Sequence, residues 1–334
     1  MLKRITLVLL TAAALAAAPV RAATLELLNV SYDPTRELWR DINAAFIPKY
    51  QAQTGTALEI KQSHGGSATQ ARAVVDGLDA DVVSLAMFPD TDAIRKSGQM
   101  EAGWVNRLPN NSLPYTSTLL FVVRKGNPKG IKDWPDLIQP GIEIVTPNPK
   151  TSGNGKVSFL AAWGSVTQRG GSEAEALEFV KKLYEHVPVL DLGARGSTTT
   201  FVQKKIGDVH LAWENEALLE VNEAAGEVEV VIPPISFLAE PHVAWVDANV
   251  KRKGTAAAAK AYLEFLYTVD GQTIIAKNFY RPTDPAVRQR YAKEFPDIKL
   301  FPVTAIAKSW DDAYEKFFNE GKLFDSFYKP GARP

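Results

Sequence analysis

The segment QSHGGSATQ, residues 62–70, connects a strand-like run to a run that favours a helix. The glycines Gly65 and Gly66 permit a turn with positive φ, and Ser67 stands where a helix N-cap belongs. Residues 68–78 are predicted to form the helix itself. Such a helix start leaves backbone N–H groups unpaired, so it can bind an anion without a cationic side chain. Most Ser N-caps only begin helices, so the argument depends on the recurrence of this turn elsewhere in the chain.

The same order of strand, polar turn and helix recurs along the chain. In the first unit a strand at 24–30 precedes a turn at 31–35 and a helix at 36–50, and further turns lie at 147–155 and 193–200. The other predicted elements are the strands 58–61, 80–87, 114–125, 142–146, 187–190, 209–213, 228–232 and 240–246, and the helices 157–163, 173–185, 200–205, 214–225, 256–267, 271–277 and 310–319. Alternating strands and helices predict an α/β fold.

The length predicts more than one domain. A chain of 334 residues is too long for one ordinary compact core, and about two domains are expected. A hydrophobic fraction of 46% and a charged fraction of 23% are typical of a soluble globular protein. The predicted strand 114–125 and the Gly- and Pro-rich segment after it form a candidate crossing between domains, and Pro233-Pro234 marks a candidate return.

Residues 1–22 have the composition of a signal peptide. Lys3 and Arg4 precede an apolar run at 5–20, and Val20-Arg21-Ala22 fits a small-residue cleavage site. The run is too short for a comfortable membrane span. We therefore expect an exported protein that is cleaved after Ala22, with cleavage after Ala23 as the alternative.

Cysteine content and charge exclude several classes of protein. The chain has no cysteine, which excludes disulfides, thiolate metal sites, cysteine nucleophiles and a lipid anchor on cysteine. Removal of the signal peptide takes three of the 38 basic residues and leaves a net charge of about −3. We expect no nucleic-acid binding, since that would require a basic surplus or stripe.

The polar turns predict a ligand that is held by donors. They present backbone N–H groups or hydroxyls around Asp33, Ser67, 152–154 and Ala194, and Trp213 at a strand end adds an indole N–H that cannot accept. A ligand bound only by donors should be a fully deprotonated oxyanion. Each bond to a charged group contributes roughly 1.5–3 kcal/mol, and a micromolar site needs about 8 kcal/mol net. About seven donors can therefore outweigh the cost of desolvating a dianion.

A hydrolase of sulfate or phosphate esters is the alternative from a different class. The sequence contains no G-x-S-x-G elbow, no H-E-x-x-H motif and no cysteine from which formylglycine could form. Its four histidines, at 64, 186, 210 and 242, lack close metal-ligand spacing, which also argues against a zinc- or iron-binding protein. We therefore predict no catalysis, no metal and no cofactor.

Longer segments resemble the periplasmic sulfate-binding proteins of ABC importers, including the sulfate/thiosulfate-binding branch. The similarity runs from about residue 25 to 301. It rests on NVSYDPTREL, QSHGGS, DVVSLA, PYTST, RKGNPKGIKDW, PNPKTSG, GARGSTTTF, GDVHLAWENEALL and KNFYRP. The resemblance implies a type II periplasmic-binding clamshell, in which two doubly wound α/β domains are joined by crossover strands. We expect domain I at 23–113 and about 240–310, domain II at about 114–239, and a C-terminal helical tail at 311–334.

The resemblance also implies the site residues. The implied contacts are the hydroxyls of Ser67 and Ser152, the indole of Trp213, and the backbone amides of Asp33, Ser67, Gly153, Asn154 and Ala194. Asn154 stands where the family has a glycine, so its side chain could crowd the anion or add a donor. Two further residues are supporting candidates. Arg195 is expected to act indirectly, by pairing with Asp33 or holding its turn, with simple surface placement as the alternative. His64 is expected to be a hydrogen-bonded structural histidine rather than a ligand.

The function that the resemblance implies is capture of sulfate in an interdomain cleft, with thiosulfate as a second candidate. The protein would be a periplasmic monomer that delivers the anion to a membrane permease driven by an ATPase. Two other oxyanions remain as alternatives. Phosphate keeps a proton at neutral pH and would need an acceptor, which none of the implied contacts supplies. Molybdate, like sulfate, carries no proton, so only the size of the cleft separates the two.

Overall fold

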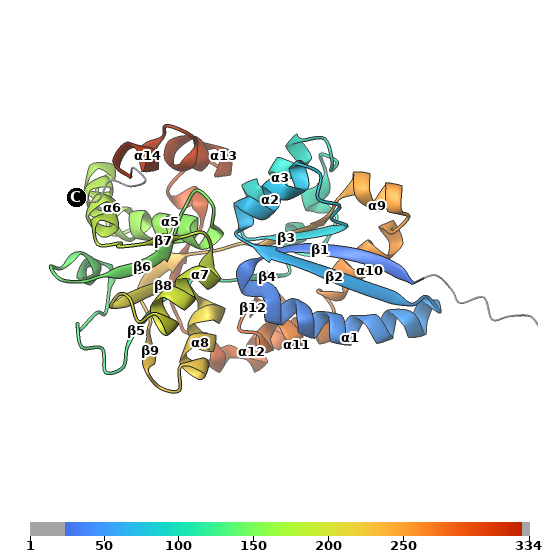
Figure 1. Cartoon of the computed structure of the whole chain (residues 1–334), viewed down its shortest axis with the longest axis horizontal. Helices are drawn as coiled ribbons and strands as arrows, with labels where there is room; N and C mark the ends of the chain where they lie inside the picture. The colour runs from blue at the N-terminus through green and yellow to red at the C-terminus, as the bar shows by residue number, and fades with distance from the viewer. Residues whose placement is uncertain (1–23, 329–334) are drawn as a thin grey trace, which may run out of the picture.

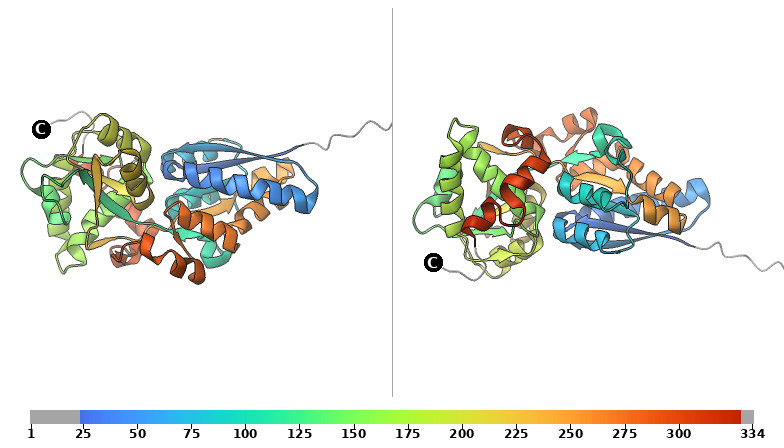
Figure 2. Two further views of the ribbon diagram at one scale, coloured as in Figure 1. Left: turned by 90° about the horizontal axis from the view of Figure 1, so that it is seen from below. Right: turned by 90° about the horizontal axis from the view of Figure 1, so that it is seen from above.

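The computed structural model describes residues 24–328, which form two α/β lobes joined by crossing segments (Figure 1). The sheet of the first lobe has the order β11-β3-β1-β2. In it β1 (Leu25–Tyr32) runs parallel to β2 (Leu58–Gly65) and to β3 (Val82–Leu85), and β11 (His242–Trp245) runs antiparallel to β3. Views from below and above show the same division into two lobes (Figure 2).

The second lobe contains a five-stranded sheet of order β7-β6-β8-β5-β9. Its strands are β5 (Leu119–Arg124), β6 (Ile144–Pro147), β7 (Leu190–Asp191), β8 (Val209–Trp213) and β9 (Val228–Val231). β6 is parallel to both β7 and β8, whereas β5 is antiparallel to β8 and β9. The predicted two-domain α/β clamshell is therefore confirmed.

Helices pack around both sheets. The α-helices are α1 (Arg36–Thr54), α2 (Ser67–Val75), α3 (Phe88–Lys96), α4 (Pro109–Ser112), α5 (Gly153–Thr167), α6 (Glu173–Glu185), α7 (Ala194–Thr198), α8 (Glu214–Glu223), α9 (Asp247–Lys253), α10 (Ala256–Phe265), α11 (Val269–Lys277), α12 (Pro285–Arg290), α13 (Trp310–Ala313) and α14 (Leu323–Phe327). A 3-10 turn, η1 (Asp33–Thr35), joins β1 to α1. In α5, residues 153–165 are buried on every side, so this helix forms part of the core of the second lobe.

The crossing segments pair with each other between the lobes. Ser117 and Ala239 form an antiparallel bridge, in which the Ser117 N–H donates to Ala239 O at 3.0 Å and the Ala239 N–H donates to Ser117 O at 2.9 Å. Thr118 Oγ1 donates to Phe237 O at 2.9 Å. Beside this bridge, β4 (Tyr115–Thr116) pairs with β12 (Arg281–Pro282). The predicted strand 114–125 is therefore divided into β4 and β5, because the chain passes from the first lobe to the second between them.

The C-terminal part of the chain packs on the second lobe. β13 (Lys299–Phe301) runs parallel to β10 (Ile235–Phe237), and the Phe301 ring lies against Gly164 of α5. The Phe317 ring meets that of Trp163 at 4.9 Å between centroids. Residues 299–301, which we expected in domain I, therefore lie beside β10 of the second lobe, where the Phe301 ring covers α5. The other domain boundaries remain predictions.

Several local predictions differ from the structure. The predicted helix 200–205 is a π-helical turn, η4 (Thr199–Gln203), and the predicted helix 310–319 divides into α13 and a second π-helical turn, η7 (Tyr314–Phe318). No helix was predicted at α3, α4, α9 or α12, and the predicted turn at 193–200 contains α7. The signal peptide at 1–22 and its cleavage site lie outside the described residues, as do residues 329–334 of the tail. Within residues 24–328, no helix is both long and apolar enough to cross a membrane.

Candidate functional site

Four of the predicted site segments begin helical turns at the ends of strands. Asp33 begins η1 after β1, Ser67 begins α2 after β2, Gly153 begins α5 after β6, and Ala194 begins α7 after β7. The first N–H groups of a helix have no intrahelical acceptor, so these starts can bind an anion. In Figure 1, α2 of the first lobe faces α5 and α7 of the second across the boundary between the lobes.

Close contacts between glycines and the opposite lobe show that these turns meet. A side chain at Gly153 would collide with Ala86, which follows β3 of the first lobe. A side chain at Gly193 would collide with the Asp33 carboxylate. The absence of a Cβ at both positions therefore lets the helix starts of the two lobes come together.

Trp213 places a buried donor in this region. Its side chain is 1% exposed, and its Nε1 has no hydrogen-bond partner among the residues that the structure describes. The indole N–H can only donate, so an acceptor atom of a ligand would satisfy it. The Trp213 ring packs on Tyr32, directly before Asp33, at 5.7 Å between ring centroids. The indole of the second lobe thus lies beside the Asp33 turn of the first.

The two predicted serine hydroxyls differ. Ser67 Oγ donates to Asp90 Oδ2 at 2.6 Å and accepts from the Ala86 N–H at 3.0 Å. A hydroxyl has one proton, so the predicted donation from the Ser67 side chain to an anion conflicts with its bond to Asp90, and its backbone N–H is the remaining candidate. Ser152 precedes α5 and, within the described part of the chain, makes no capping hydrogen bond to the helix. Its hydroxyl therefore stays a candidate donor for a ligand.

Sequence reasoning missed the group that surrounds Asp90. Tyr314 Oη donates to Asp90 Oδ1 at 3.1 Å, and Lys156 Nζ lies 3.7 Å from the same oxygen. The side chains of Lys156 and Asp90 are almost fully buried, and they come from different lobes. No local sequence signal connects α3, α5 and η7, so only the fold could reveal this group.

The side chain of Asn154 points away from the helix start toward β8. When the side-chain amide is oriented with its nitrogen toward β8, the nitrogen donates to Leu211 O at 3.1 Å. Its oxygen then accepts from the backbone N–H of Trp213 at 3.2 Å. In this orientation Asn154 uses its side chain to connect the first turn of α5 to the strand that ends at Trp213. Its backbone N–H remains at the helix start, where the replaced glycine would have presented the same group.

Arg195 has different partners from the one we predicted. Arg195 Nη2 lies 3.1 Å from Glu37 Oε2 of the first lobe and 3.1 Å from Glu216 Oε1 of the second. The predicted pairing of Arg195 with Asp33 is wrong, because Asp33 pairs with Arg36 on its own turn at 2.7 Å. Arg195 therefore bridges the lobes beside the site.

His64 is hydrogen-bonded as expected for a structural histidine. Its Nδ1 lies 2.7 Å from Ser31 Oγ, and the two residues are partners in the β1–β2 register. Burial lowers the pKa of His64 to about 4, with a further contribution from Arg36. The imidazole is thus neutral at pH 7 and adds no positive charge for an anion.

The carboxylates after Trp213 are paired with arginines. Arg281 contacts Glu214 through two hydrogen bonds of 2.7 and 2.8 Å. Burial raises the pKa of Glu216 to about 7, although Arg195 opposes this shift. Among residues 24–328, no group of three or more His, Asp or Glu side chains could hold a metal ion. The arrangement can bind a small anion through neutral donors while the nearby charges balance one another.

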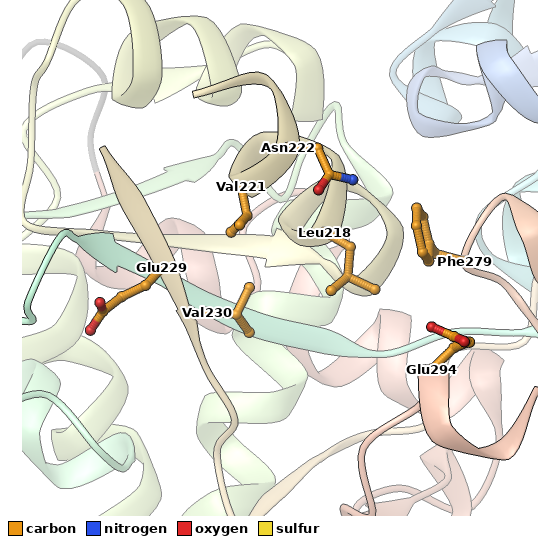
Figure 3. A pocket seen from close by; sticks show the side chains of 7 residues that line it. All are labelled: Leu218, Val221, Asn222, Glu229, Val230, Phe279 and Glu294. Atoms are coloured by element: carbon orange, nitrogen blue, oxygen red, sulfur yellow. The ribbon is translucent and has the colours of Figure 1, made fainter. Parts of the chain in front are cut away.

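A cavity of about 420 Å³ lies outside this region, between α8, β9 and the segment after α11. Figure 3 shows the seven side chains that line it: Leu218, Val221, Asn222, Glu229, Val230, Phe279 and Glu294. It contains none of the predicted site residues. Its aliphatic and aromatic side chains and two carboxylates do not suit an anion.

Comparison with known proteins identifies the family. The model for bacterial extracellular solute-binding proteins matches residues 38–281. The sulfate-binding protein of Escherichia coli K12 is 51% identical over 317 residues, which cover 94% of this chain and 96% of that protein. The thiosulfate-binding protein of Pseudomonas aeruginosa PAO1 is 46% identical over 331 residues, which cover 98% of this chain and 100% of that protein.

A solved structure agrees with these matches. The sulfate-binding protein SubI from Mycobacterium tuberculosis H37Rv has a TM-score of 0.80 and 34% sequence identity, and the match covers 88% of this chain and 100% of that chain. The protein therefore belongs to the bacterial extracellular solute-binding protein family and groups there with the sulfate- and thiosulfate-binding proteins.

Proposed function

We propose that this protein is the solute-binding component of an ABC importer and captures sulfate between its two lobes, with thiosulfate as a second candidate ligand. The observation that carries the proposal is the buried indole N–H of Trp213, which has no partner among the described residues and lies beside the Asp33 turn, in the region where helix starts of the two lobes meet. The names of the similar proteins support the choice of anion.

Seven donors form the proposed site. They are the backbone N–H groups of Asp33, Ser67, Gly153, Asn154 and Ala194, the Ser152 hydroxyl and the Trp213 indole. Seven bonds to a dianion, each contributing roughly 1.5–3 kcal/mol, can exceed the cost of its desolvation. The Ser67 hydroxyl is not included, because its proton is directed to Asp90.

Selectivity follows from the absence of a carboxylate among these seven groups, since only the Ser152 hydroxyl has lone pairs that could accept a hydrogen bond. Sulfate has no proton at neutral pH, so each of its oxygens can accept. Phosphate retains a proton that would remain without a partner in the site. Molybdate has no proton either, and we propose that the size of the closed site discriminates against it.

The remaining parts of the proposal concern partners and location. The protein would work in the periplasm as a monomer after removal of its signal peptide. It would close around sulfate because the ligand contacts both lobes, and then dock on a permease that an ATPase drives. The similar proteins are named as binding proteins, which supports a role without catalysis.

The test is calorimetry on the mature protein, freed of bound anion, with sulfate, thiosulfate, molybdate and phosphate in separate titrations. We expect one-to-one binding of sulfate and no heat from phosphate. Ser152→Ala should weaken sulfate binding. Ser165→Ala is its matched control, because Ser165 Oγ donates to Ala162 O at 2.7 Å inside α5. Binding of phosphate or molybdate without binding of sulfate would overturn the proposal.

A further inference from the structure

The carbonyl oxygen of Pro34 accepts two hydrogen bonds. Pro34 is buried in η1, directly after Asp33. Tyr280 Oη donates to Pro34 O at 2.7 Å, and Asn215 Nδ2 donates to it at 3.1 Å. A carbonyl oxygen has two lone pairs, so these donors use its full capacity.

The two donors come from different lobes. Tyr280 lies between α11 and β12, and its ring packs on Tyr115 at 4.6 Å between centroids, beside the first lobe. Asn215 lies in the first turn of α8 in the second lobe, two residues after Trp213. The Tyr280 bond can persist when the lobes separate, whereas the Asn215 bond exists only when they are together.

The amide of Asn215 is committed to this contact. Asn215 is 1% exposed, and its Oδ1 has no hydrogen-bond partner among the described residues. Reversal of the amide would place that oxygen against Pro34 O, so the hydrogen bond determines the orientation of the amide. A buried amide with only one of its two ends satisfied is destabilising by itself, which suggests a role in function.

We infer that Asn215 is a positioning residue: by bonding to the Pro34 carbonyl in the closed protein, its amide holds the Asp33 N–H of one lobe and the Trp213 indole of the other against the same anion. This inference rests on the proposed function. Both ends of the Asn215–Pro34 hydrogen bond are close in the chain to a proposed donor. Pro34 follows Asp33 directly. Asn215 follows Trp213 after one residue, Glu214, whose carboxylate is held by Arg281.

Asn215→Leu tests the inference because leucine has a similar size and cannot donate. Sulfate affinity is measured by calorimetry, and the dissociation rate by stopped-flow tryptophan fluorescence. We expect Kd to rise about two- to tenfold, the range for loss of one neutral hydrogen bond. The change should appear mainly in faster dissociation, because the bond forms only on closure. Asn215→Asp, which also loses the donor, is the second variant and should weaken binding at least as much.

Asn249→Leu is the matched control. Asn249 Nδ2 donates to Ala80 O at 2.9 Å, and both residues belong to the first lobe. This variant should lower Tm and leave sulfate Kd unchanged. Tyr280→Phe gives an additional test: with only one donor left on Pro34 O, Asn215→Leu should raise Kd by a larger factor in that background than in the wild type.

Wild-type Kd and dissociation rate in Asn215→Leu would overturn the inference, as would an equal rise in Kd for Asn249→Leu. If the wild type binds none of the four anions, the proposed function fails. The inference is then decided by small-angle scattering of the ligand-free proteins. Asn215→Leu should have a larger radius of gyration than the wild type, and an equal radius would overturn it.

Discussion

Trp213→Phe should separate affinity from stability more sharply than any other single change. Phenylalanine keeps an aromatic ring against Tyr32 but removes the indole N–H. A hydrogen bond to a charged group contributes about 1.5–3 kcal/mol, so sulfate Kd should rise roughly tenfold to 150-fold. In the closed arrangement the same N–H is buried without a partner among residues 24–328, whereas separation of the lobes would expose it to water. The free energy of unfolding of the anion-free protein should therefore fall only by the cost of the smaller ring.

Trp163→Phe is a matched control for this prediction. Trp163 is likewise buried, and its Nε1 also has no partner within the described residues, but it packs on Phe317 away from the proposed site. Calorimetry with sulfate and thermal unfolding of the anion-free proteins should show a similar small change in Tm for both variants and a loss of affinity for Trp213→Phe alone. Unchanged affinity in Trp213→Phe, or an equal loss in Trp163→Phe, would refute the reasoning.

Three further predictions concern the groups around the donors. Ser152→Ala should raise sulfate Kd by roughly tenfold or more, and Ser67→Ala by less, because the Ser67 hydroxyl donates to Asp90; calorimetry showing the reverse order would contradict this assignment. The pKa of Glu216 is raised from 4.5 to about 7, so its contribution to stability is fully present below about pH 4.5 and is lost as the pH rises through 7. Glu216→Gln should therefore gain stability relative to wild type between pH 5 and 8, by up to about 3 kcal/mol in urea unfolding, and a constant difference across that range would exclude the effect. Arg195→Gln should change sulfate Kd by less than about fivefold, because Arg195 pairs with Glu37 and Glu216, and a hundredfold loss would show that the guanidinium acts directly on the anion.

Sequence reasoning found the parts of the site that depend on local signals. The strand that ends at Trp213 follows from its apolar pattern. The start of α2 was predicted to within one residue, but its N-cap is Gly66 and not Ser67, and φ of Gly66 is −58°, so the predicted turn with positive φ is wrong. Such features involve residues that are close together in the chain, where propensity and turn chemistry act. The α/β class could be predicted for the same reason, whereas two domains were expected from the chain length and the clamshell from the resemblance.

Contacts between distant residues could not be predicted in this way. Asp90 accepts a hydrogen bond from Ser67, 23 positions earlier in the chain, and Asn215 donates one to Pro34, 181 positions earlier. The resemblance implied the Ser67 hydroxyl as a donor, and only the fold brings a competing carboxylate within 2.6 Å of it. The placement of β13 against the second lobe is also long-range, since it depends on Phe301 covering α5.

The charges near the site explain how closure can be reversible. Arg195 pairs with Glu37, and Lys156 lies beside Asp90, so each contact joins a cation of the second lobe to an anion of the first. Side chains of both Arg195 and Glu37 remain about 30% exposed, so solvent screens this pair and it contributes about 0–1 kcal/mol. The contact between Lys156 and Asp90 is buried, so the attraction between the two charges at 3.7 Å is opposed by the cost of desolvating both groups. The lobes therefore gain little from these pairs alone, and a ligand that bonds to both lobes can decide the equilibrium. Because Arg195 and Lys156 both have carboxylate partners among the described residues, the proposed site offers a dianion neutral donors rather than an unpaired cation.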